Sequence, residues 1–348
     1  MPRSPLPEFL QGPENTPVLD VRAPIEYNQG HIPGALSFPL FSDEERARIG
    51  TTYKQTSQEK AVLLGLDLFG PKMSQMVKVA SKLAPAKEVR VHCWRGGMRS
   101  GAVQWLLELA GFKVHLLNKG YKEYRQWVLT QFTTPRPLLV LGGLTGSGKT
   151  DVLHELARLH EPVADLEGLA SHKGSAFGSI GLPPQPTQEQ FENDLAATLA
   201  QLSVEAPVWV EDESRTIGGI HVPPPLFRQM SEAPLVVLEI PRMVRVRKLA
   251  EEYGREDPGA LATSILRIRK RLGGLATKEA LSAIAEDDME KMVSLVLDYY
   301  DKTYNHGLEG RKAVRVVSST CEAAVNAELV REATRQTIVS SVPSNNVV

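Results

Sequence analysis

The fold of the second half of the chain is predicted best by the stretch Leu138-Leu-Val-Leu-Gly-Gly-Leu-Thr-Gly-Ser-Gly-Lys-Thr150. Its first four residues are apolar and predict a buried strand, while Gly143–Thr150 fits the pattern G-x-x-x-x-G-K-[ST] in full. After Thr150, apolar side chains recur at helical spacing as far as Arg158. A strand, a glycine-rich loop and a helix in this order present backbone N–H groups that bind phosphate.

This phosphate loop and the polar residues expected around it form the first candidate site. Its glycines let the backbone approach a phosphate, Lys149 would neutralise a di- or triphosphate, and Thr150 could hold Mg²⁺. The residues expected to bind phosphate are Gly143, Gly146, Ser147, Gly148, Lys149 and Thr150. Polar residues at strand ends commonly face the same crevice, and those expected to flank this one are Asp165, Glu167, His172, Glu211, Asp212 and Arg215.

The identity of the phosphate ligand stays open at this point. The stretch Val208–Glu213 resembles a Walker B strand, with Glu211 or Asp212 near a metal ion, but the sequence does not define a metal site. We find no guanine-specifying Asn-Lys-x-Asp sequence. A diphosphate that is not a nucleotide would satisfy the same loop, so the motif predicts phosphate chemistry without predicting ATP hydrolysis.

A cysteine loop in the first half, Val91-His-Cys-Trp-Arg-Gly-Gly-Met-Arg-Ser-Gly101, forms the second candidate site. Cys93 lies between a predicted strand and a predicted helix. Glycines let successive N–H groups turn inward as an anion-binding nest, and the helix adds its positive N-terminal end. We expect these dipoles, together with Arg95 and Arg99, to favour the thiolate, which makes Cys93 a candidate nucleophile.

Both halves alternate short apolar runs with helical patterns, which predicts two α/β domains with parallel, doubly wound sheets. Strands are expected at 16–22, 89–92, 113–117, 138–141, 208–210 and 234–240, and helices dominate 242–305. The prolines of Thr133–Pro137 predict a boundary. The expected division is one domain at 1–132, a P-loop domain with a helical extension at 133–336, and a flexible tail at 337–348.

Composition excludes several classes of protein. Of the 348 residues, 42% are hydrophobic and 23% are charged, which excludes fibrous and disordered classes. No apolar run approaches the roughly 20 residues that span a bilayer, and the N-terminus lacks the features of a signal peptide. Two cysteines cannot build a disulfide framework or a cysteine-rich zinc site. We therefore expect a cytoplasmic protein without a membrane partner.

Basic residues are distributed unevenly, although the net charge is only −1. Residues 1–131 carry more basic than acidic side chains, and basic residues gather again at 242–271. A basic track of this kind is typical of contacts with the phosphate backbone of RNA. The candidates for such contacts are Lys122, Arg125, Arg242, Arg245, Arg247 and Arg269.

The first half resembles a rhodanese domain. The resemblance rests on Leu19-Asp-Val-Arg-Ala-Pro-Ile-Glu-Tyr27, on Gly30-His-Ile-Pro-Gly-Ala35 and on the cysteine loop. In that family the cysteine carries a persulfide or the heavier chalcogen, which implies this role for Cys93. The loop is longer than in many small rhodaneses and matches the His-Cys-x5-Arg spacing of cysteine phosphatases, so we expect it to accept a phosphorylated donor. Asp20, Arg22 and His31 are expected to support the fold.

Six stretches of the chain, which include both loops, together match one known family. They are Phe41–Gly50, Thr52–Ser57, Cys93–Ser100, Gly143–Thr150, Asp165–Ala170 and Glu211–Gly218. By these stretches the chain resembles the bacterial tRNA 2-selenouridine synthase family. This resemblance implies a transferase that converts wobble 2-thiouridine in tRNA to 2-selenouridine through an S-geranyl intermediate. It implies geranyl diphosphate and selenophosphate as co-substrates and no tightly bound cofactor, and it leaves a need for Mg²⁺ open.

A geranyl tail would require an apolar channel. The candidates for its lining are Phe177, Ile180, Leu182, Phe191 and Phe227. Their spacing does not distinguish a channel from a hydrophobic core, and we expect most of them in the core.

The main alternative function is a rhodanese-type sulfurtransferase fused to an ATP-dependent small-molecule kinase, which predicts ATP turnover. A cysteine phosphatase is a weaker alternative, because no convincing general-acid loop accompanies the His-Cys-x5-Arg match. A non-catalytic RNA-binding regulator is a further alternative, but it would need neither the Cys93 loop nor the phosphate loop.

Overall fold

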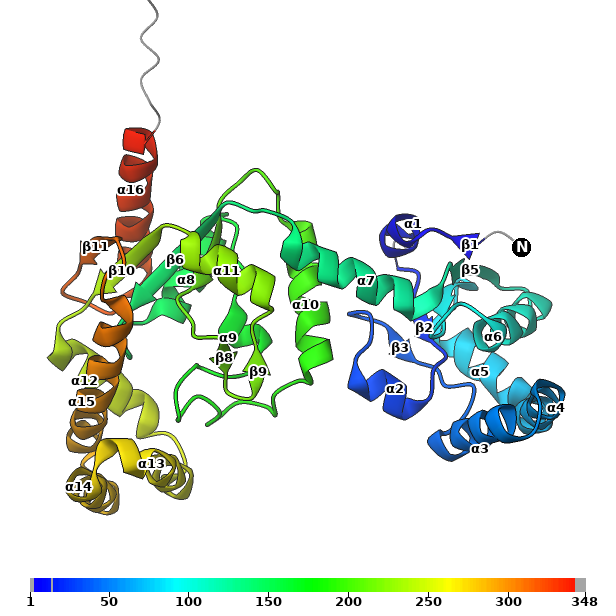
Figure 1. The fold of residues 1–348 in the computed structure, drawn as a ribbon, viewed down its shortest axis with the longest axis horizontal. Coiled ribbons are helices and arrows are strands. Elements are labelled where there is room, and N and C mark those ends of the chain that lie inside the picture. Colours follow the sequence, from blue (N-terminus) through cyan, green and yellow to red (C-terminus); the bar gives the residue numbers. More distant parts are fainter. Residues whose placement is uncertain (1–2, 14, 342–348) are drawn as a thin grey trace, which may run out of the picture. The chain divides into compact units, whose positions relative to one another are not determined.

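The computed structural model describes residues 3–13 and 15–341 (Figure 1). Contacts between Cα atoms divide the chain into two compact units, Met1–Gln131 with Glu192–Ala197 and Phe132–Phe191 with Thr198–Val348. The predicted boundary between residues 132 and 133 falls one residue after the end of the first stretch. Helix α10 (Gln188–Gln201) contributes its middle residues to the first unit, which the sequence analysis does not predict.

The first unit contains a parallel sheet with the strand order β1-β5-β4-β2-β3. The strands are β1 (Arg3–Ser4), β2 (Val18–Asp20), β3 (Leu36–Ser37), β4 (Glu88–His92) and β5 (Lys113–Leu117). From β2 the chain builds outward to β3 on one side and to β4 and β5 on the other. Ligands of such sheets bind beyond the carboxyl ends of the strands where this reversal occurs, and Cys93 directly follows β4.

Helices surround this sheet and enclose its apolar core. They are α1 (Leu6–Gln11), α2 (Pro24–Gln29), α3 (Asp43–Gln55), α4 (Gln58–Phe69), the 3₁₀ turn η1 (Gly70–Lys72), α5 (Met73–Leu83), α6 (Met98–Leu109) and α7 (Gly120–Thr133). Ser42 caps α3 by accepting a hydrogen bond from the Glu45 N–H group. Leu19, Val91 and Leu107 are fully buried between the sheet and the helices.

The second unit contains a parallel sheet with the strand order β11-β10-β6-β7. The strands are β6 (Leu138–Gly143), β7 (Val208–Glu211), β10 (Leu235–Glu239) and β11 (Ala313–Val317), and β8 (Thr216–Ile217) pairs with β9 (Ile220–His221) in a separate hairpin. Every residue of β6 is buried. β6 has β7 on one side and β10 on the other, so the phosphate loop that follows it lies at the switch point of the sheet.

A helical part extends this second unit, as predicted. The helices are α8 (Lys149–Arg158), α9 (Leu166–Leu169), α10, α11 (Pro224–Glu232), α12 (Arg242–Tyr253), α13 (Pro258–Leu272), α14 (Gly274–Ala285), α15 (Met289–Leu308) and α16 (Ala323–Ser341). Helices α12 to α15 form a core of their own, in which Leu261, Ile265 and Ala280 are fully buried. The second unit therefore has one core on its sheet and another among its helices.

The predicted tail at 337–348 requires a correction at its start. Helix α16 continues to Ser341, because the segment from Thr337 to Ser341 contains neither glycine nor proline. The sequence places Pro343 two residues after Ser341, the last residue of this helix. Residues 342–348 lie outside the described part of the chain.

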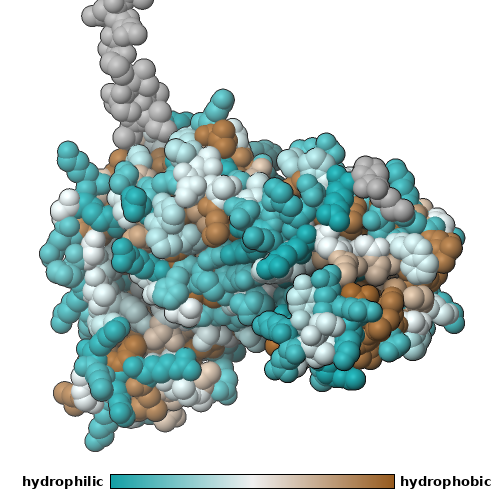
Figure 2. All heavy atoms as spheres, turned by 45° about the vertical axis from the view of Figure 1, so that its right-hand side comes forward, coloured by the Kyte–Doolittle hydropathy of each residue, from teal (hydrophilic) through white to brown (hydrophobic). Residues whose placement is uncertain are grey.

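Hydrophilic residues cover most of the face seen in Figure 2, with apolar residues in smaller patches. No helix within residues 3–13 and 15–341 is both long and apolar enough to cross a membrane.

Candidate functional site

The phosphate loop connects β6 to α8 in a conformation that its glycines permit. Gly146 and Gly148 have φ angles of 82° and 80°, a region that favours glycine. A Cβ atom on Gly146 would lie only 2.7 Å from Leu249 Cδ1. The Lys149 ammonium group donates a hydrogen bond to the Gly143 carbonyl oxygen at 3.1 Å. The loop therefore ends at a helix N-terminus with a cation beside it, as anion binding requires.

Thr150 and Glu167 lie together next to this loop. The Thr150 hydroxyl donates a hydrogen bond to Glu167 Oε2 at 2.6 Å. Mg²⁺ commonly binds one or two carboxylates together with substrate phosphates, so these two residues would hold it beside a diphosphate. Within the described residues, no group of three or more His, Cys, Asp or Glu side chains is arranged to hold a metal ion. Asp212 instead accepts hydrogen bonds from Tyr304 at 3.1 Å and Arg311 at 2.9 Å.

A cavity of about 480 Å³ opens beside the phosphate loop. One end of it is polar and is lined by Gly146, Lys149, Thr150 and Glu167. Its remaining walls come from α8, α12, α13, α15 and the segments 173–180 and 212–214. Their apolar and aromatic members are Ala176, Phe177, Ile180, Leu249, Tyr253, Ile268, Tyr299, Tyr300 and Tyr304, and charged side chains such as Lys248, Glu252, Glu256 and Arg271 lie among them. A single space therefore joins the anion-binding loop to a wall rich in aromatic side chains.

Burial raises the pKa of two carboxyl groups near the loop, Glu211 and Glu213. Burial raises the pKa of Glu211 well above its ordinary value, and the neighbouring Asp165 and Glu167 raise it further. Burial and Glu167 also raise the pKa of Glu213, which lines the cavity, to about 8. Burial alone would raise the pKa of Asp165, but hydrogen bonds with Glu211 and His154 outweigh it and lower that pKa. Glu213 therefore repels an anionic ligand in the cavity less than an ordinary glutamate would at pH 7.

The predicted flanking residues fall into two groups. Glu167 and Asp212 line the cavity, whereas Glu211 lies behind it and accepts a hydrogen bond from the Leu166 N–H group at 3.0 Å. Asp165 caps α9 by accepting a hydrogen bond from the Gly168 N–H group at 2.6 Å. Glu211 and Asp165 thus position α9, which carries Glu167.

His172 and Arg215 are not among the residues that line the cavity. The His172 ring packs so closely against Gly178 that a Cβ atom there would lie 2.8 Å from it. The Arg215 guanidinium lies 5.6 Å from the centre of the Phe227 ring. Both residues contact neighbouring protein rather than the cavity.

The candidates for a tail channel divide in the same way. Phe177 and Ile180 line the cavity, while Leu182, Phe191 and Phe227 do not. Phe191 is fully buried, so the expectation that it belongs to the core is confirmed.

The N-terminus of α7 holds the Cys93 loop. The Tyr121 N–H group donates a hydrogen bond to the Cys93 carbonyl oxygen at 2.8 Å, and the Lys122 N–H group donates one to the Trp94 carbonyl oxygen at 2.9 Å. A Cβ atom on Gly120 would overlap the Cys93 carbonyl oxygen, so this approach requires glycine. Because α7 fixes these two carbonyl groups, it also fixes the direction in which the loop leaves β4.

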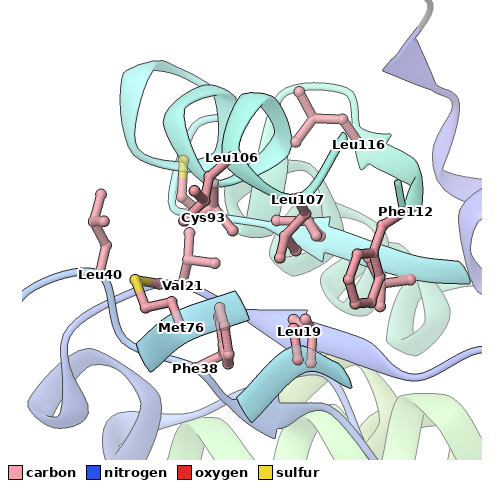
Figure 3. Packing of buried hydrophobic residues seen from close by; sticks show 14 of the residues in the cluster. Leu19, Val21, Phe38, Leu40, Met76, Cys93, Leu106, Leu107, Phe112 and Leu116 are labelled. Carbon is pink, nitrogen blue, oxygen red and sulfur yellow. The ribbon is translucent and has the colours of Figure 1, made fainter. Parts of the chain in front are cut away.

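The Cys93 side chain lies at the base of its loop. It is only 3% exposed, and its Sγ atom lies 3.1 Å from the hydroxyl oxygen of Ser100 in the first turn of α6. Figure 3 shows Cys93 among apolar side chains that include Val21 and Leu106. The thiol group is therefore held between the loop and the start of α6.

The two arginines of the loop have different surroundings. Arg99 forms an ion pair with Glu26 of α2 at 2.6 Å. Burial would lower the pKa of Arg99, but its hydrogen bond and ion pair with Glu26 outweigh this and raise it. Arg95 is exposed. An anion that enters the loop thus competes with Glu26 for Arg99.

Asp20 and Arg22 form a buried ion pair beside this loop. Arg22 Nη2 donates hydrogen bonds to Asp20 Oδ2 at 2.6 Å and to the Gly30 carbonyl oxygen at 2.6 Å. The guanidinium also lies 3.7 Å from the centre of the Tyr121 ring. The predicted supporting role of Asp20 and Arg22 fits these contacts. His31 stacks on Tyr27 with 3.9 Å between ring centres.

His92, the residue before Cys93, is expected to make the stability of the first unit depend on pH. Burial lowers the pKa of His92 to about 4, although Asp20 Oδ2 lies 3.7 Å away and opposes the shift. The His92 side chain therefore takes up a proton near pH 6.5 in the unfolded chain, but only near pH 4 in the folded protein. The resulting stability is present above pH 6.5 and is lost as the pH falls. Between pH 7 and pH 5 we expect a loss of about 2 kcal/mol.

Urea unfolding followed by tryptophan fluorescence measures this loss in a Trp209→Phe background, where the remaining tryptophans belong to the first unit. A His92→Gln variant is the control, because it cannot titrate in this range. Its stability is expected to lose this part of the pH dependence, and an unchanged pH dependence in His92→Gln would contradict the assignment.

One predicted RNA contact requires a correction. Arg245 is only 2% exposed and forms an ion pair with Asp301 of α15 at 2.7 Å. It also donates a hydrogen bond to the Thr145 carbonyl oxygen at 3.0 Å. A buried guanidinium group cannot reach RNA. Arg245 instead holds the phosphate loop in place through its hydrogen bond to Thr145.

The other predicted RNA contacts differ in their availability. Arg242 forms ion pairs with Asp298 and Asp301, and Arg125 forms one with Glu192. Lys122, Arg247 and Arg269 are exposed.

The sequence did not identify several residues of the cavity. Lys248 lines it and forms an ion pair with Asp151. Tyr300 and Tyr304 also line it, and their spacing of four residues places them on one face of α15. The spacing of the two tyrosines predicts that they share one face of a helix. The sequence does not predict whether that face packs into a core or lines a cavity.

Comparisons with known proteins agree with both loops. Residues 136–336 match the family described as tRNA 2-selenouridine synthase AAA domain, and residues 6–126 match the rhodanese-like domain. A protein of Nitrosomonas europaea named tRNA 2-selenouridine synthase is 38% identical over 289 residues, which cover 80% of this chain and 74% of that protein. Proteins of the same name from Salmonella enteritidis and Salmonella typhimurium are each 38% identical over 352 aligned residues, covering 90% of this chain and 94% of each relative. By this likeness over most of its length, the chain belongs to the tRNA 2-selenouridine synthase family.

Proposed function

We propose that this protein converts 2-thiouridine at the wobble position of tRNA to 2-selenouridine in two steps. Geranyl diphosphate first alkylates the sulfur atom, and selenium from selenophosphate then replaces the S-geranyl group. The observation that carries this proposal is the cavity of about 480 Å³ that joins the phosphate loop to an apolar, aromatic wall. Geranyl diphosphate has the same two parts, an anionic head and a hydrocarbon tail.

In the first step the phosphate loop holds the leaving group. The sulfur of 2-thiouridine attacks the first carbon of the geranyl chain, the carbon–oxygen bond to the diphosphate breaks, and the base releases its N3 proton. Lys149 and the loop N–H groups stabilise the negative charge that collects on the departing diphosphate. Mg²⁺ at Thr150 and Glu167 would neutralise more of this charge.

In the second step Cys93 takes part in the delivery of selenium. Alkylation turns the sulfur of the base into a good leaving group, so that the selenium of selenophosphate attacks C2 and the geranyl thiolate departs. Water then cleaves the phosphorus–selenium bond, phosphate leaves, and N3 regains the proton that it lost in the first step. Arg95, which is exposed at the entrance of the loop, attracts the phosphorylated donor. Ser100, whose hydroxyl donates a hydrogen bond to the Gly97 carbonyl oxygen, lies 3.1 Å from Cys93 Sγ and holds the cysteine against the loop.

The tRNA backbone is proposed to contact basic residues at the end of α13. Arg271 lines the cavity, and Arg267, Arg269 and Lys270 are exposed on the same last turns of this helix. Phosphates that flank the modified nucleotide would lie there when the base reaches the geranyl group. Cys93 and Cys321 are both unpaired, which supports the proposed location in the cytoplasm.

The test is an assay with tRNA that contains 2-thiouridine, incubated with the protein, geranyl diphosphate and selenophosphate. Mass spectrometry of the digested nucleosides is expected to detect S-geranyl-2-thiouridine when selenophosphate is omitted, and 2-selenouridine when both donors are present. ATP is expected to be neither required nor consumed. An unchanged nucleoside together with stoichiometric ATP turnover would overturn the proposal and favour the sulfurtransferase–kinase alternative.

A further inference from the structure

We propose that Lys248 of α12 is a second cation of the phosphate site and binds the diphosphate that the phosphate loop holds. This inference rests on the proposed function, in which the loop binds the diphosphate of the substrate, and it adds a residue that lies outside the loop motif. Lys248 lines the same cavity as Gly146, Gly148 and Lys149. Because Lys248 belongs to another helix, the packing of the fold brings it to the loop.

The Lys248 ammonium group lies next to the last glycine of the loop. Its Nζ atom is 3.1 Å from the position that a Cβ atom on Gly148 would take. It therefore lies no more than about 5 Å from the Gly148 Cα atom, since a carbon–carbon bond adds about 1.5 Å. The N–H groups at the end of such a loop, where its helix begins, are among those that bind phosphate. An anion on these N–H groups is within reach of Lys248.

The contacts of α12 with the phosphate loop fix this position. Arg245 donates a hydrogen bond to the Thr145 carbonyl oxygen at 3.0 Å. Leu249 packs against Gly146, where a Cβ atom would lie 2.7 Å from Leu249 Cδ1. Residues three and four positions apart share one face of a helix, so Lys248 lies on the face of α12 that meets the loop. Its neighbours on the helix therefore keep it there.

The charge of Lys248 is only partly engaged by its protein partners. It forms an ion pair with Asp151 in the first turn of α8, and Glu252 lies 3.8 Å away. Burial would lower the pKa of Lys248, but its hydrogen bond and ion pair with Asp151 outweigh this and raise it. The Asp151 side chain is 52% exposed, against 20% for Lys248. Asp151 can therefore turn to water when a more highly charged diphosphate takes its place.

The two lysines lie at opposite ends of the phosphate loop. The Lys149 ammonium group donates a hydrogen bond to the carbonyl oxygen of Gly143, at the start of the loop, whereas Lys248 lies beside Gly148, at its end. A diphosphate has two charged groups and gains more from two cations than from one. Negative charge increases on the diphosphate as it departs, so Lys248 also stabilises the leaving group.

The experiment measures the binding of inorganic pyrophosphate, the product of the proposed first step, to the full-length chain by isothermal titration calorimetry. Lys248→Met keeps most of the length of the side chain and removes its charge. We expect it to raise the Kd for pyrophosphate by about tenfold, since a hydrogen bond to a charged group contributes roughly this factor or more.

Replacing Asp151 separates binding from a merely structural ion pair. Asp151→Asn removes the group that competes for Lys248, and we expect it to lower the Kd by about threefold, the usual scale of an exposed ion pair. If the pair only held α8 to α12, both variants would weaken binding. The double variant tests for direct contact, because Lys248→Met should cost more affinity in the Asp151→Asn background, where Lys248 is free to bind the anion.

Arg247→Ala is the matched control for a loss of positive charge. Arg247 precedes Lys248 on α12, is exposed and does not line the cavity, so its Kd for pyrophosphate should equal that of the wild type. Circular dichroism and thermal unfolding establish that each variant is folded.

The outcomes separate this inference from the proposed function. A wild type that does not alkylate 2-thiouridine in tRNA with geranyl diphosphate would overturn the proposed function. A wild type that does so, with an unchanged Kd for pyrophosphate in Lys248→Met, weaker binding in Asp151→Asn or additive effects in the double variant, would overturn only the assignment of Lys248. Opposite shifts in the two single variants, with the larger loss in the Asp151→Asn background, would support it.

Discussion

Replacing Cys93 by alanine is expected to stop the reaction after geranylation, so that tRNA accumulates S-geranyl-2-thiouridine and gains no 2-selenouridine. The methyl group of alanine cannot act as a nucleophile, and the rate of selenium transfer should fall on the order of 10³-fold or more. Geranylation should be unchanged, because the phosphate loop and its cavity belong to the second unit. Nucleoside mass spectrometry follows both products in one digest.

The chain offers a control for this substitution. Cys321 is its other cysteine, half-buried and outside any disulfide, and its thiol donates a hydrogen bond to the Gly146 carbonyl oxygen at 3.6 Å. Because this contact is far from the Cys93 loop in sequence and belongs to the second unit, Cys321→Ala should transfer selenium to geranylated tRNA at the wild-type rate. Cys93→Ser should behave like Cys93→Ala, since a hydroxyl group of similar size is a far weaker nucleophile than a thiolate. Normal selenation by Cys93→Ala would show that the rhodanese-like unit acts in some other way.

Replacing Lys149 by alanine is expected to slow the geranylation step and to leave the selenium step intact. Lys149 supplies the positive charge beside the phosphate loop, and losing a preorganised donor to the leaving group commonly lowers kcat by roughly 10²–10³-fold. Geranylation should fall by this factor. Selenation of tRNA that already carries the S-geranyl group should continue at the wild-type rate, because Cys93 and its loop are intact.

Lys278→Ala is the matched control, since Lys278 is exposed on α14 and does not line the cavity. Lys149→Arg should recover only part of the activity, because a planar guanidinium replaces a compact ammonium group. If Lys149→Ala geranylates as fast as the wild type, the diphosphate does not bind at the phosphate loop.

Both reaction loops were predictable because each is a local feature of the chain. The phosphate loop needs only a strand, glycines at fixed spacing and a helix, all within a single run of residues, and β6 and α8 form where the pattern predicts them. The Cys93 loop has the same strand–loop–helix character between β4 and α6. The conformational freedom of glycine and the periodicity of apolar residues determine structure over short stretches of chain. The local elements that they predict are therefore the ones that the folded protein contains.

The charge environment was less predictable because ion pairs depend on residues far away in the sequence. Arg245 belongs to a run of basic residues that predicts an exposed, RNA-binding surface. In the folded protein it is buried, and Asp301 on α15 neutralises its charge. Arg99 likewise meets Glu26 of α2. The sequence gives the charges, but only the packing of helices decides which of them reach solvent.

The apolar wall of the cavity shows the same limit. Phe177 and Ile180 were recognised as candidates, whereas Tyr253 and Tyr300 lie on helices in a part of the chain where composition and spacing predict only helical structure. An aromatic residue on a helix packs into a core or lines a cavity with the same periodicity. The choice between the two follows from how α12, α13 and α15 meet around the segment 173–180.

The strand order also has a consequence for the order in which the chain can fold during its synthesis. The sheet of the first unit is complete once Leu117 has been made, but β11, which pairs with β10, ends at Val317. At roughly 5–20 residues per second, the ribosome needs about 10–40 s to add the residues between them. For about the last 4–16 s of that time, after Glu239 has been made, the edge of β10 lacks its partner. Asn193, which hydrogen-bonds to the His31 carbonyl oxygen at 2.9 Å and to the Tyr121 hydroxyl at 2.7 Å, also reaches the first unit only after its sheet has formed. The rhodanese-like unit is therefore the early product of translation, and the phosphate loop becomes part of a finished sheet only near the end.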